Sequence, residues 1–211
     1  MRKIKKFLLN IVLFAKLPSN AKQAIRKLNS SSICIDAGAN AGSISEIFAK
    51  SGALVYSFEP DSLAFEKLQS NTIKYSNIII EKKAVGTENV RKKLYKHKQS
   101  SSSGSVDFSQ ASSLMIEKPN VSFDNFEYVD VIDLSSFIST LNKVDILKID
   151  IEGSEIFLIP HLIKTGCLEK VDLVFVETHE RKWPDLSDAT RNMLDVTMNS
   201  KYSKKISFNW I

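Results

Sequence analysis

Ile33-Cys34-Ile35-Asp36-Ala37-Gly38-Ala39-Asn40-Ala41-Gly42-Ser43 is the stretch that decides the fold. A short apolar run ends in an acid, a glycine-spaced turn follows, and the next apolar residues recur with helical spacing. Gly38 and Gly42 allow a tight turn and the close approach of a ligand, because glycine has no Cβ atom. The stretch therefore predicts a strand, a turn and a helix, with a nucleotide-type binding edge at the carboxyl end of the strand.

The composition of the turn narrows the choice of ligand. A dinucleotide fingerprint has the pattern G-x-G-x-x-G, but here Asn40 replaces the middle glycine and Ser43 the third. Asp36 would repel a pyrophosphate and attract an ammonium or a sulfonium group. Both features argue against a nicotinamide oxidoreductase. The turn resembles the first motif of the class I S-adenosylmethionine (SAM)-dependent methyltransferases, an acid followed by x-G-x-G-x-G, which Asp36, Gly38 and Gly42 match. The alternative interpretation is a purely structural turn.

A second acid follows the next predicted strand. Residues 53–58 form an apolar run that ends in Glu59 and Pro60, and Glu59 lies 21 residues after Gly38. Rossmann-like folds place at this distance the carboxylate that accepts the ribose hydroxyls of a nucleotide. A carboxylate suits two vicinal hydroxyls because it offers two acceptor oxygens. The alternative is an exposed loop acid without a ligand.

Strand and helix patterns alternate along the rest of the chain, which predicts an α/β fold with a doubly wound, mostly parallel sheet. A helix is expected over residues 20–29, and another over residues 187–199. An exposed side hairpin is expected from the alternating pattern of residues 90–96 and the strand at 126–132, after which Asp133 caps a helix. The remaining strands are expected at residues 78–80, 144–150, 171–179 and 205–211.

The combination of motifs resembles the FkbM family of SAM-dependent methyltransferases over roughly residues 33–180. The matching segments are Ile35–Gly42, Tyr56–Pro60, Ala84–Gly86, Ser112–Leu114, Leu147–Glu155 and Val176–His179. The resemblance implies that SAM is the cofactor, that Ala84 and Val85 border its adenine, and that Asn40 and Pro60 belong to the same edge. Only 32 residues follow His179, so the usual antiparallel pair of C-terminal strands is expected to be reduced to one.

The resemblance also implies transfer of a methyl group to a hydroxyl. The expected acceptor is a sugar of a cell-surface glycan, and the alternatives are a small natural product or a non-catalytic scaffold that binds SAM or a nucleotide. Asp150 and Glu177 end neighbouring predicted strands, and His179 has the same side-chain parity as Glu177 if the strand continues. These three are the candidate catalytic residues, with His179 as a base.

A metal-assisted mechanism is the second possibility from the same residues. Asp150, Glu177 and His179 could together hold a divalent ion that lowers the pKa of the acceptor hydroxyl. Lys148, Glu152 and Glu155 are expected to orient the loop and cap the following helix.

Charge divides the chain into a basic arm, residues 1–30, and a methyltransferase domain, residues 31–211. The arm holds eight of the 29 Lys and Arg residues and none of the 24 Asp and Glu, so the remainder carries a net charge of about −3. An acidic body argues against general nucleic-acid binding. Two cysteines without metal spacing fit a cytoplasmic protein.

The arm itself leaves two interpretations open. Residues 1–17 form either a helix packed on the domain or a basic amphipathic helix on the anionic inner face of a membrane. The run is too short to span a bilayer. Residues 99–113 contain eight serines and predict a functional lid. The oligomeric state is not determined by the sequence.

Overall fold

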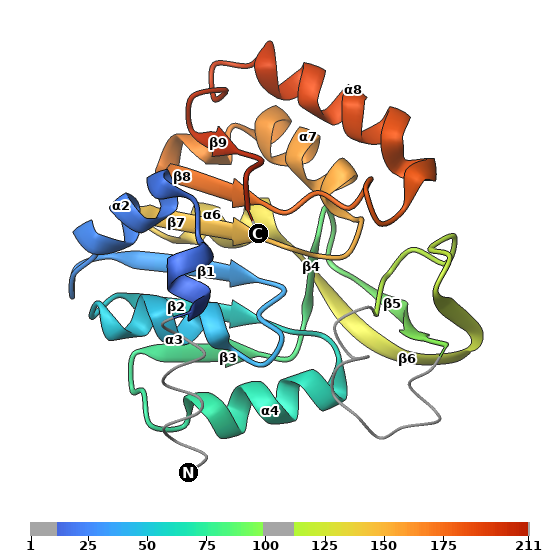
Figure 1. The fold of residues 1–211 in the computed structure, drawn as a ribbon, viewed down its shortest axis with the longest axis horizontal. Coiled ribbons are helices and arrows are strands. Elements are labelled where there is room, and N and C mark those ends of the chain that lie inside the picture. The colour runs from blue at the N-terminus through green and yellow to red at the C-terminus, as the bar shows by residue number, and fades with distance from the viewer. Residues whose placement is uncertain (1–11, 99–111, 211) are drawn as a thin grey trace.

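The computed structural model of the chain describes residues 12–98 and 112–210. Its helices and strands alternate over most of this length (Figure 1). In chain order they are α2 (Ser19–Lys27), β1 (Ile33–Ala37), α3 (Ser43–Lys50), β2 (Leu54–Phe58), α4 (Ser62–Thr72), β3 (Ile78–Glu81), β4 (Ala84–Gly86), β5 (Val90–His97), β6 (Val121–Asp133), α6 (Leu134–Thr140), β7 (Val144–Ile149), α7 (Glu155–Thr165), the 3-10 helix η2 (Cys167–Lys170), β8 (Val171–Val176), the 3-10 helix η3 (Pro184–Leu186), α8 (Ser187–Met198) and β9 (Ile206–Ser207).

Six strands form the central sheet in the order β3-β2-β1-β7-β8-β9, and every neighbouring pair in it is parallel. The strand order reverses between β1 and β7. Open sheets of this kind bind ligands outside the carboxyl ends of the strands at such a switch point. The predicted doubly wound α/β fold is confirmed, and the switch point lies at the end of the strand that opens the sequence.

Helices cover both faces of the sheet, because neighbouring residues of each central strand point to opposite sides. Cys34 of β1 packs with α2 and α3 in one apolar layer, whereas Ile35 packs with α6, α7 and α8 in the other. Both layers are continuous across β7 and β8 as well. The two-sided core fixes the register of the strands and therefore the position of the residues that follow them.

A smaller sheet lies beside the carboxyl ends of the central strands (Figure 1). Its order is β4-β6-β5, with β5 and β6 antiparallel as the side hairpin was predicted to be. Asp133 accepts a hydrogen bond from the backbone amide of Ser135 at 2.9 Å and so caps α6 as expected. Ser113 forms a β-bridge with Tyr95 of β5 and donates a hydrogen bond to the carbonyl of Glu152, so the segment after residue 111 joins the small sheet to the loop after β7. The lid predicted for residues 99–113 otherwise lies outside the described residues.

Two predictions about the C-terminal part are corrected. The strand predicted for residues 171–179 ends at Val176, because the last pairing with β7 joins Ile149 and Val176. The strand predicted for residues 205–211 is only the two-residue β9, and it runs parallel to β8. Glu177 and His179 therefore lie in a loop, where strand parity no longer decides the direction of their side chains.

The described part of the basic arm packs against the domain. Leu17 is 2 % exposed and shares an apolar cluster with Ile25 of α2, Phe48 of α3 and Phe175 of β8. Residues 12–16 are helical, and Leu13 and Phe14 contact the same cluster. The arm before residue 12 lies outside the described residues. Among those described, no helix is long and apolar enough to cross a membrane.

Burial of Leu17 predicts that this part of the arm stabilises the fold. Leu17→Ala should lower the free energy of unfolding by about 2–4 kcal/mol, because it removes buried apolar atoms and leaves a cavity. Val12→Ala is the matched control, since Val12 is 50 % exposed and its truncation should change stability by less than about 0.5 kcal/mol. Urea unfolding of both variants measures the difference. Equal stability of the two would mean that residues 12–17 are not part of the core.

Candidate active site

The turn after β1 adopts left-handed backbone conformations that explain its composition. Gly38 has φ of +78°, and a Cβ atom there would lie 1.8 Å from the carbonyl oxygen of Asp150. Only glycine permits this close approach of the two loops. Asn40 has φ of +49°, and asparagine is enriched in this region among residues that carry a side chain. The departure from the family glycine at position 40 therefore preserves the backbone shape.

Beneath this turn lies a buried polar network. Lys148 donates a hydrogen bond to the carbonyl oxygen of Gly38 at 2.7 Å, and its Nζ lies 3.2 Å from Asp36 Oδ1 and 3.5 Å from Asp150 Oδ2. Burial opposes the charge of Lys148, but Asp36 and then Asp150 outweigh it and raise its pKa. The predicted orienting role of Lys148 agrees with these contacts.

Two of the predicted cofactor residues lie under the site and not on its surface. Asp36 is fully buried and accepts a hydrogen bond from Ser45 Oγ at 2.6 Å. Gly42 precedes α3 with φ of +84°, and a Cβ atom there would lie 2.7 Å from Leu68 Cδ1. Neither residue lines the two cavities described below, so both support the turn from behind.

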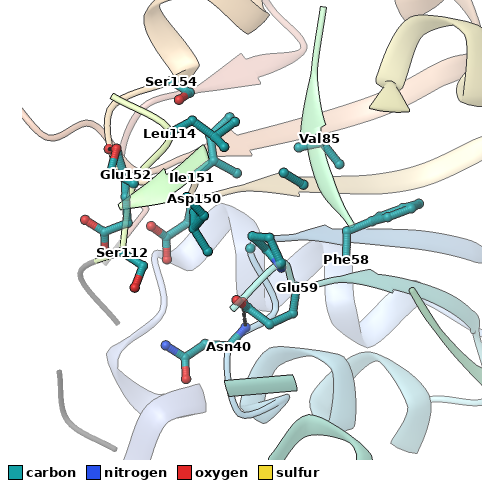
Figure 2. Close-up of a pocket in the computed structure, with 15 residues that line it drawn as sticks. Asn40, Phe58, Glu59, Val85, Ser112, Leu114, Asp150, Ile151, Glu152 and Ser154 are labelled. Carbon is teal, nitrogen blue, oxygen red and sulfur yellow. Dashed lines mark hydrogen bonds between the residues drawn. The ribbon is translucent and has the colours of Figure 1, made fainter. Parts of the chain in front are cut away.

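Glu59 joins the ends of β1 and β2. Its Oε2 accepts a hydrogen bond from the Asn40 amide at 2.7 Å (Figure 2), and its Oε1 accepts one from the Asp61 amide at 2.8 Å. Burial raises the pKa of Glu59 to about 8, although both amide donors favour the charged form. Each carboxylate oxygen keeps a second acceptor site for a ligand.

A cavity opens at the carboxyl ends of β1, β2 and β7. The predicted residues Gly38, Asn40, Glu59, Pro60 and Asp150 line it together with Ala84 and Val85. The rest of the wall mixes apolar and polar side chains that were not among the predicted cofactor or catalytic residues, although all but Leu94 lie in the segments that resemble the family (Figure 2). These further lining residues are Phe58, Leu94, Ser112, Ser113, Leu114, Ile151, Glu152 and Ser154.

A second, larger cavity, lined by more charged side chains, shares four lining residues with the first. The shared residues are Gly38, Asn40, Asp150 and Glu152. Lys148, Glu177, Lys182 and Trp210 are among its other lining residues. The two cavities therefore meet at the loop that follows β7, with the Asp150 carboxylate at their common boundary.

The loop after β8 brings a histidine to two carboxylates of the loop after β7. His179 is 1 % exposed, and its Nε2 lies 3.6 Å from Asp150 Oδ1 and 3.5 Å from Glu152 Oε2. Its Nδ1 lies 2.8 Å from Oε1 of the buried Glu155. Glu155 Oε2 accepts a hydrogen bond from the Gly153 amide at the start of α7. Burial opposes the charged form of His179, but Glu155, Glu152 and Asp150 outweigh it and raise its pKa.

These contacts revise the role expected for His179. A raised pKa and a buried ring that lines neither cavity suit a positioning role better than that of the neutral base expected from the sequence. Asp150 and Glu177 do line a cavity. Glu177 Oε1 accepts a hydrogen bond from Lys182 Nζ at 2.8 Å. Burial and then the charge of Asp150 raise the pKa of Glu177.

The structure groups the acids differently from the predicted metal set. Among the described residues, the side chains whose ligand atoms lie within 4.8 Å of one another are Asp150, Glu152 and His179. Glu177 is outside this group, and Glu152 takes its place. The sequence offered one signal for including Glu152 in the group, namely that Glu152 lies two residues after Asp150. Its φ of +56°, which turns the chain there, could not be predicted from a glutamate.

The raised pKa of Glu59 predicts a pH dependence of stability. The folded chain keeps the proton on Glu59 up to about pH 8, whereas the unfolded chain loses it near pH 4.5. The contribution of Glu59 to folding is thus fully present below pH 4.5 and falls as the pH rises to about 8, by at most about 1.4 kcal/mol per pH unit. Glu59→Gln should remove this slope, whatever its effect on absolute stability. Urea unfolding across this pH range measures it, and parallel curves for the two proteins would contradict the assignment.

Comparisons with known proteins agree with the geometry. No curated protein matches the chain. A solved structure, the methyltransferase FkbM from Methylobacillus flagellatus KT, is similar with a TM-score of 0.50 and 20 % sequence identity over 81 % of this chain. The chain spans 38 % of the length of that protein, and the likeness supports the fold alone. The model of the FkbM methyltransferase domain matches residues 36–202. The chain therefore belongs to the FkbM methyltransferase domain family.

Proposed function

We propose that the chain is a SAM-dependent O-methyltransferase whose acceptor is a hydroxyl of a glycan sugar. The observation that carries the proposal is the pair of cavities that meet at Asp150. One includes the apolar side chains of Phe58, Ala84 and Val85 beside the buried Glu59 carboxylate, and the other is larger and is lined by more charged side chains. A methyltransferase needs two adjoining cavities of this kind, because the methyl donor and the acceptor must approach one reacting centre from two sides.

The first cavity suits the adenosine part of SAM. Its apolar wall, with Phe58, Ala84 and Val85, can enclose a purine ring. Glu59 lies beside this wall and retains acceptor capacity for the ribose hydroxyls. Asn40 Oδ1 is buried and has no hydrogen-bond partner among the described residues. A buried acceptor without a partner is costly, so a donor on the ligand is its natural complement.

The second cavity suits the methionine part and, beyond it, the acceptor. Glu177 offers a carboxylate to an ammonium group, and Lys182 offers a cation to a carboxylate. The sulfonium would then lie near the common boundary of the cavities. When bound, SAM supplies an electrophilic methyl group that an acceptor oxygen attacks as the methyl–sulfur bond breaks.

The chain's own residues would orient the acceptor and remove its proton. Asp150 is the candidate base because it reaches both cavities and has its position fixed by Lys148 and His179. A positioned base contributes roughly 10²–10⁴-fold to the rate. The glycan class of the acceptor rests on the family resemblance, and the polar lining of the second cavity is compatible with a sugar.

Asn40 allows a test of cofactor binding that leaves the backbone intact. Asn40→Gly removes the side-chain amide, while glycine accepts the φ of +49° and keeps the amide that donates to Glu59. SAM affinity in calorimetry should fall about 5- to 30-fold, the scale of one hydrogen bond of about 1–2 kcal/mol. Binding of NAD with no response to SAM would contradict the proposed cofactor.

Methyl transfer itself is tested with radiolabelled SAM and glycans extracted from the source cell. The wild-type chain should label the glycan fraction, and Asp150→Asn should lower the rate at least about 100-fold while SAM affinity changes little. Lys164→Gln, on an exposed part of α7, is the control and should retain full activity. SAM binding without labelling of any hydroxyl acceptor would instead favour a non-catalytic scaffold.

A further inference from the structure

The loop after β8 contains a buried histidine nitrogen that has no hydrogen-bond partner among the residues that the structure describes. His179 Nε2 is directed at Asp150 Oδ1 and Glu152 Oε2, at 3.6 and 3.5 Å, without a hydrogen bond to either. Buried polar atoms without a partner are rare in folded proteins, and each one calls for an explanation. We propose that Asp150, Glu152 and His179 bind a divalent metal cation.

The spacing of the three ligand atoms fits one ion. Two ligands that are each ~2.1 Å from a common metal lie between ~3.0 and ~4.2 Å apart for bond angles between a right angle and a straight line. Both distances from His179 Nε2 fall within this interval, and all three atoms lie within 4.8 Å of one another. Small rotations of the two carboxylates, which are partly exposed, can complete the coordination.

The histidine is held as metal ligands commonly are. Glu155 Oε1 lies 2.8 Å from Nδ1 of His179, so Nδ1 donates to Glu155, and Nε2 can present a lone pair to an ion that displaces its proton. Glu155 is itself fixed by the Gly153 amide at 3.0 Å. This carboxylate–histidine pair orients the ring from the side opposite the proposed ion.

The backbone at Glu152 supplies a second sign of specialised function. Its φ of +56° is uncommon for a residue other than glycine, asparagine or aspartate. Such strained conformations cluster at ligand sites, where the surrounding structure holds them. Here the Glu152 carbonyl accepts a hydrogen bond from Ser113 Oγ at 2.8 Å, and the strained turn directs the carboxylate toward His179.

A lysine competes with the proposed ion. Lys118, which is 7 % exposed, donates to Glu152 Oε2 at 2.6 Å and supplies one positive charge to the group. Lys148 contacts the other oxygen of Asp150, Oδ2, and leaves Oδ1 for the metal. Binding of the ion therefore requires Lys118 to withdraw or Glu152 to use its second oxygen.

One imidazole and two carboxylates suit Mn²⁺, which accepts both donor types, and are also compatible with Zn²⁺ or Mg²⁺. The protein supplies three ligands, which leaves coordination positions for water or an acceptor hydroxyl. The ion would lower the pKa of that hydroxyl, and Asp150, which would bind the ion through Oδ1 alone, would still accept the proton. This catalytic use rests on the proposed function, whereas the binding site stands by itself.

The test is a titration of the chelator-treated full chain with Mn²⁺, in the absence of SAM and acceptor. Electron paramagnetic resonance measures the free ion, and calorimetry measures the stoichiometry. We expect one Mn²⁺ per chain in the wild-type protein. His179→Gln and Glu152→Gln should each weaken binding at least about tenfold. Lys118→Met should strengthen it, because the competing ammonium is removed.

His161→Gln is the matched control, since His161 also lies beside a carboxylate, Asp133 at 3.0 Å, but outside the group. Its Mn²⁺ affinity should equal that of the wild type. Glu152→Gln lies in a partly exposed loop and keeps the test valid if the buried His179 variant fails to fold. Thermal melting monitors folding in each case.

Three results would overturn the proposal. The first is that the wild-type chain binds none of Mn²⁺, Zn²⁺ and Mg²⁺. The second is that the Glu152 and His179 variants bind the ion as tightly as the wild type does. The third is that Lys118→Met binds no ion more tightly than the wild type does. SAM binding is measured separately on the same samples. SAM bound without any metal would refute only the metal site, whereas metal bound without SAM would refute only the proposed function.

Discussion

The buried ammonium of Lys148 is the interaction on which the site depends. It projects from β7, donates to the carbonyl oxygen of Gly38 after β1, and lies between the carboxylates of Asp36 and Asp150. A buried carboxylate and a partly exposed one close to it would repel each other, and the buried one would be expensive to desolvate. Lys148 offsets that charge at the switch point of the sheet, so the β1 turn and the β7 loop can approach until only a glycine fits between them.

Most of the central sheet could be predicted from the sequence because its strands are buried on both faces. Such strands are nearly continuous apolar runs, as β1 and β7 are, and glycines or acids mark their ends. The prediction failed at the last strand, since residues 205–211 contain a pattern of strand type but only Ile206 and Ser207 pair with β8. Pairing depends on a neighbour that the local pattern does not contain, and the same reason explains why β8 ends at Val176.

The site was predicted less completely than the fold. Residues in motifs, such as Glu59 and Asp150, reached the cavity because the ends of parallel strands meet at one edge. Leu94 was not predicted, and Ser113 was indicated only by the family resemblance. Both reach the cavity from distant parts of the chain, through the small sheet and the β-bridge to it. Asp36 is the opposite case. Its place at the end of the first strand was predicted correctly, but it does not line the cavity, because Ser45 and Lys148 enclose its side chain.

The unfavourable features of the molecule are concentrated at one edge. Left-handed Asn40 and Glu152, the charges of Asp36 and Lys148, and the ring of His179 all lie at the carboxyl ends of the central strands. Each is destabilising in isolation, by roughly 1–3 kcal/mol for a strained backbone alone. The two apolar layers on either face of the sheet offset them, and the strands hold the edge in one geometry. A site of this kind is preorganised: its charges are oriented during folding, so little reorientation remains when a ligand enters.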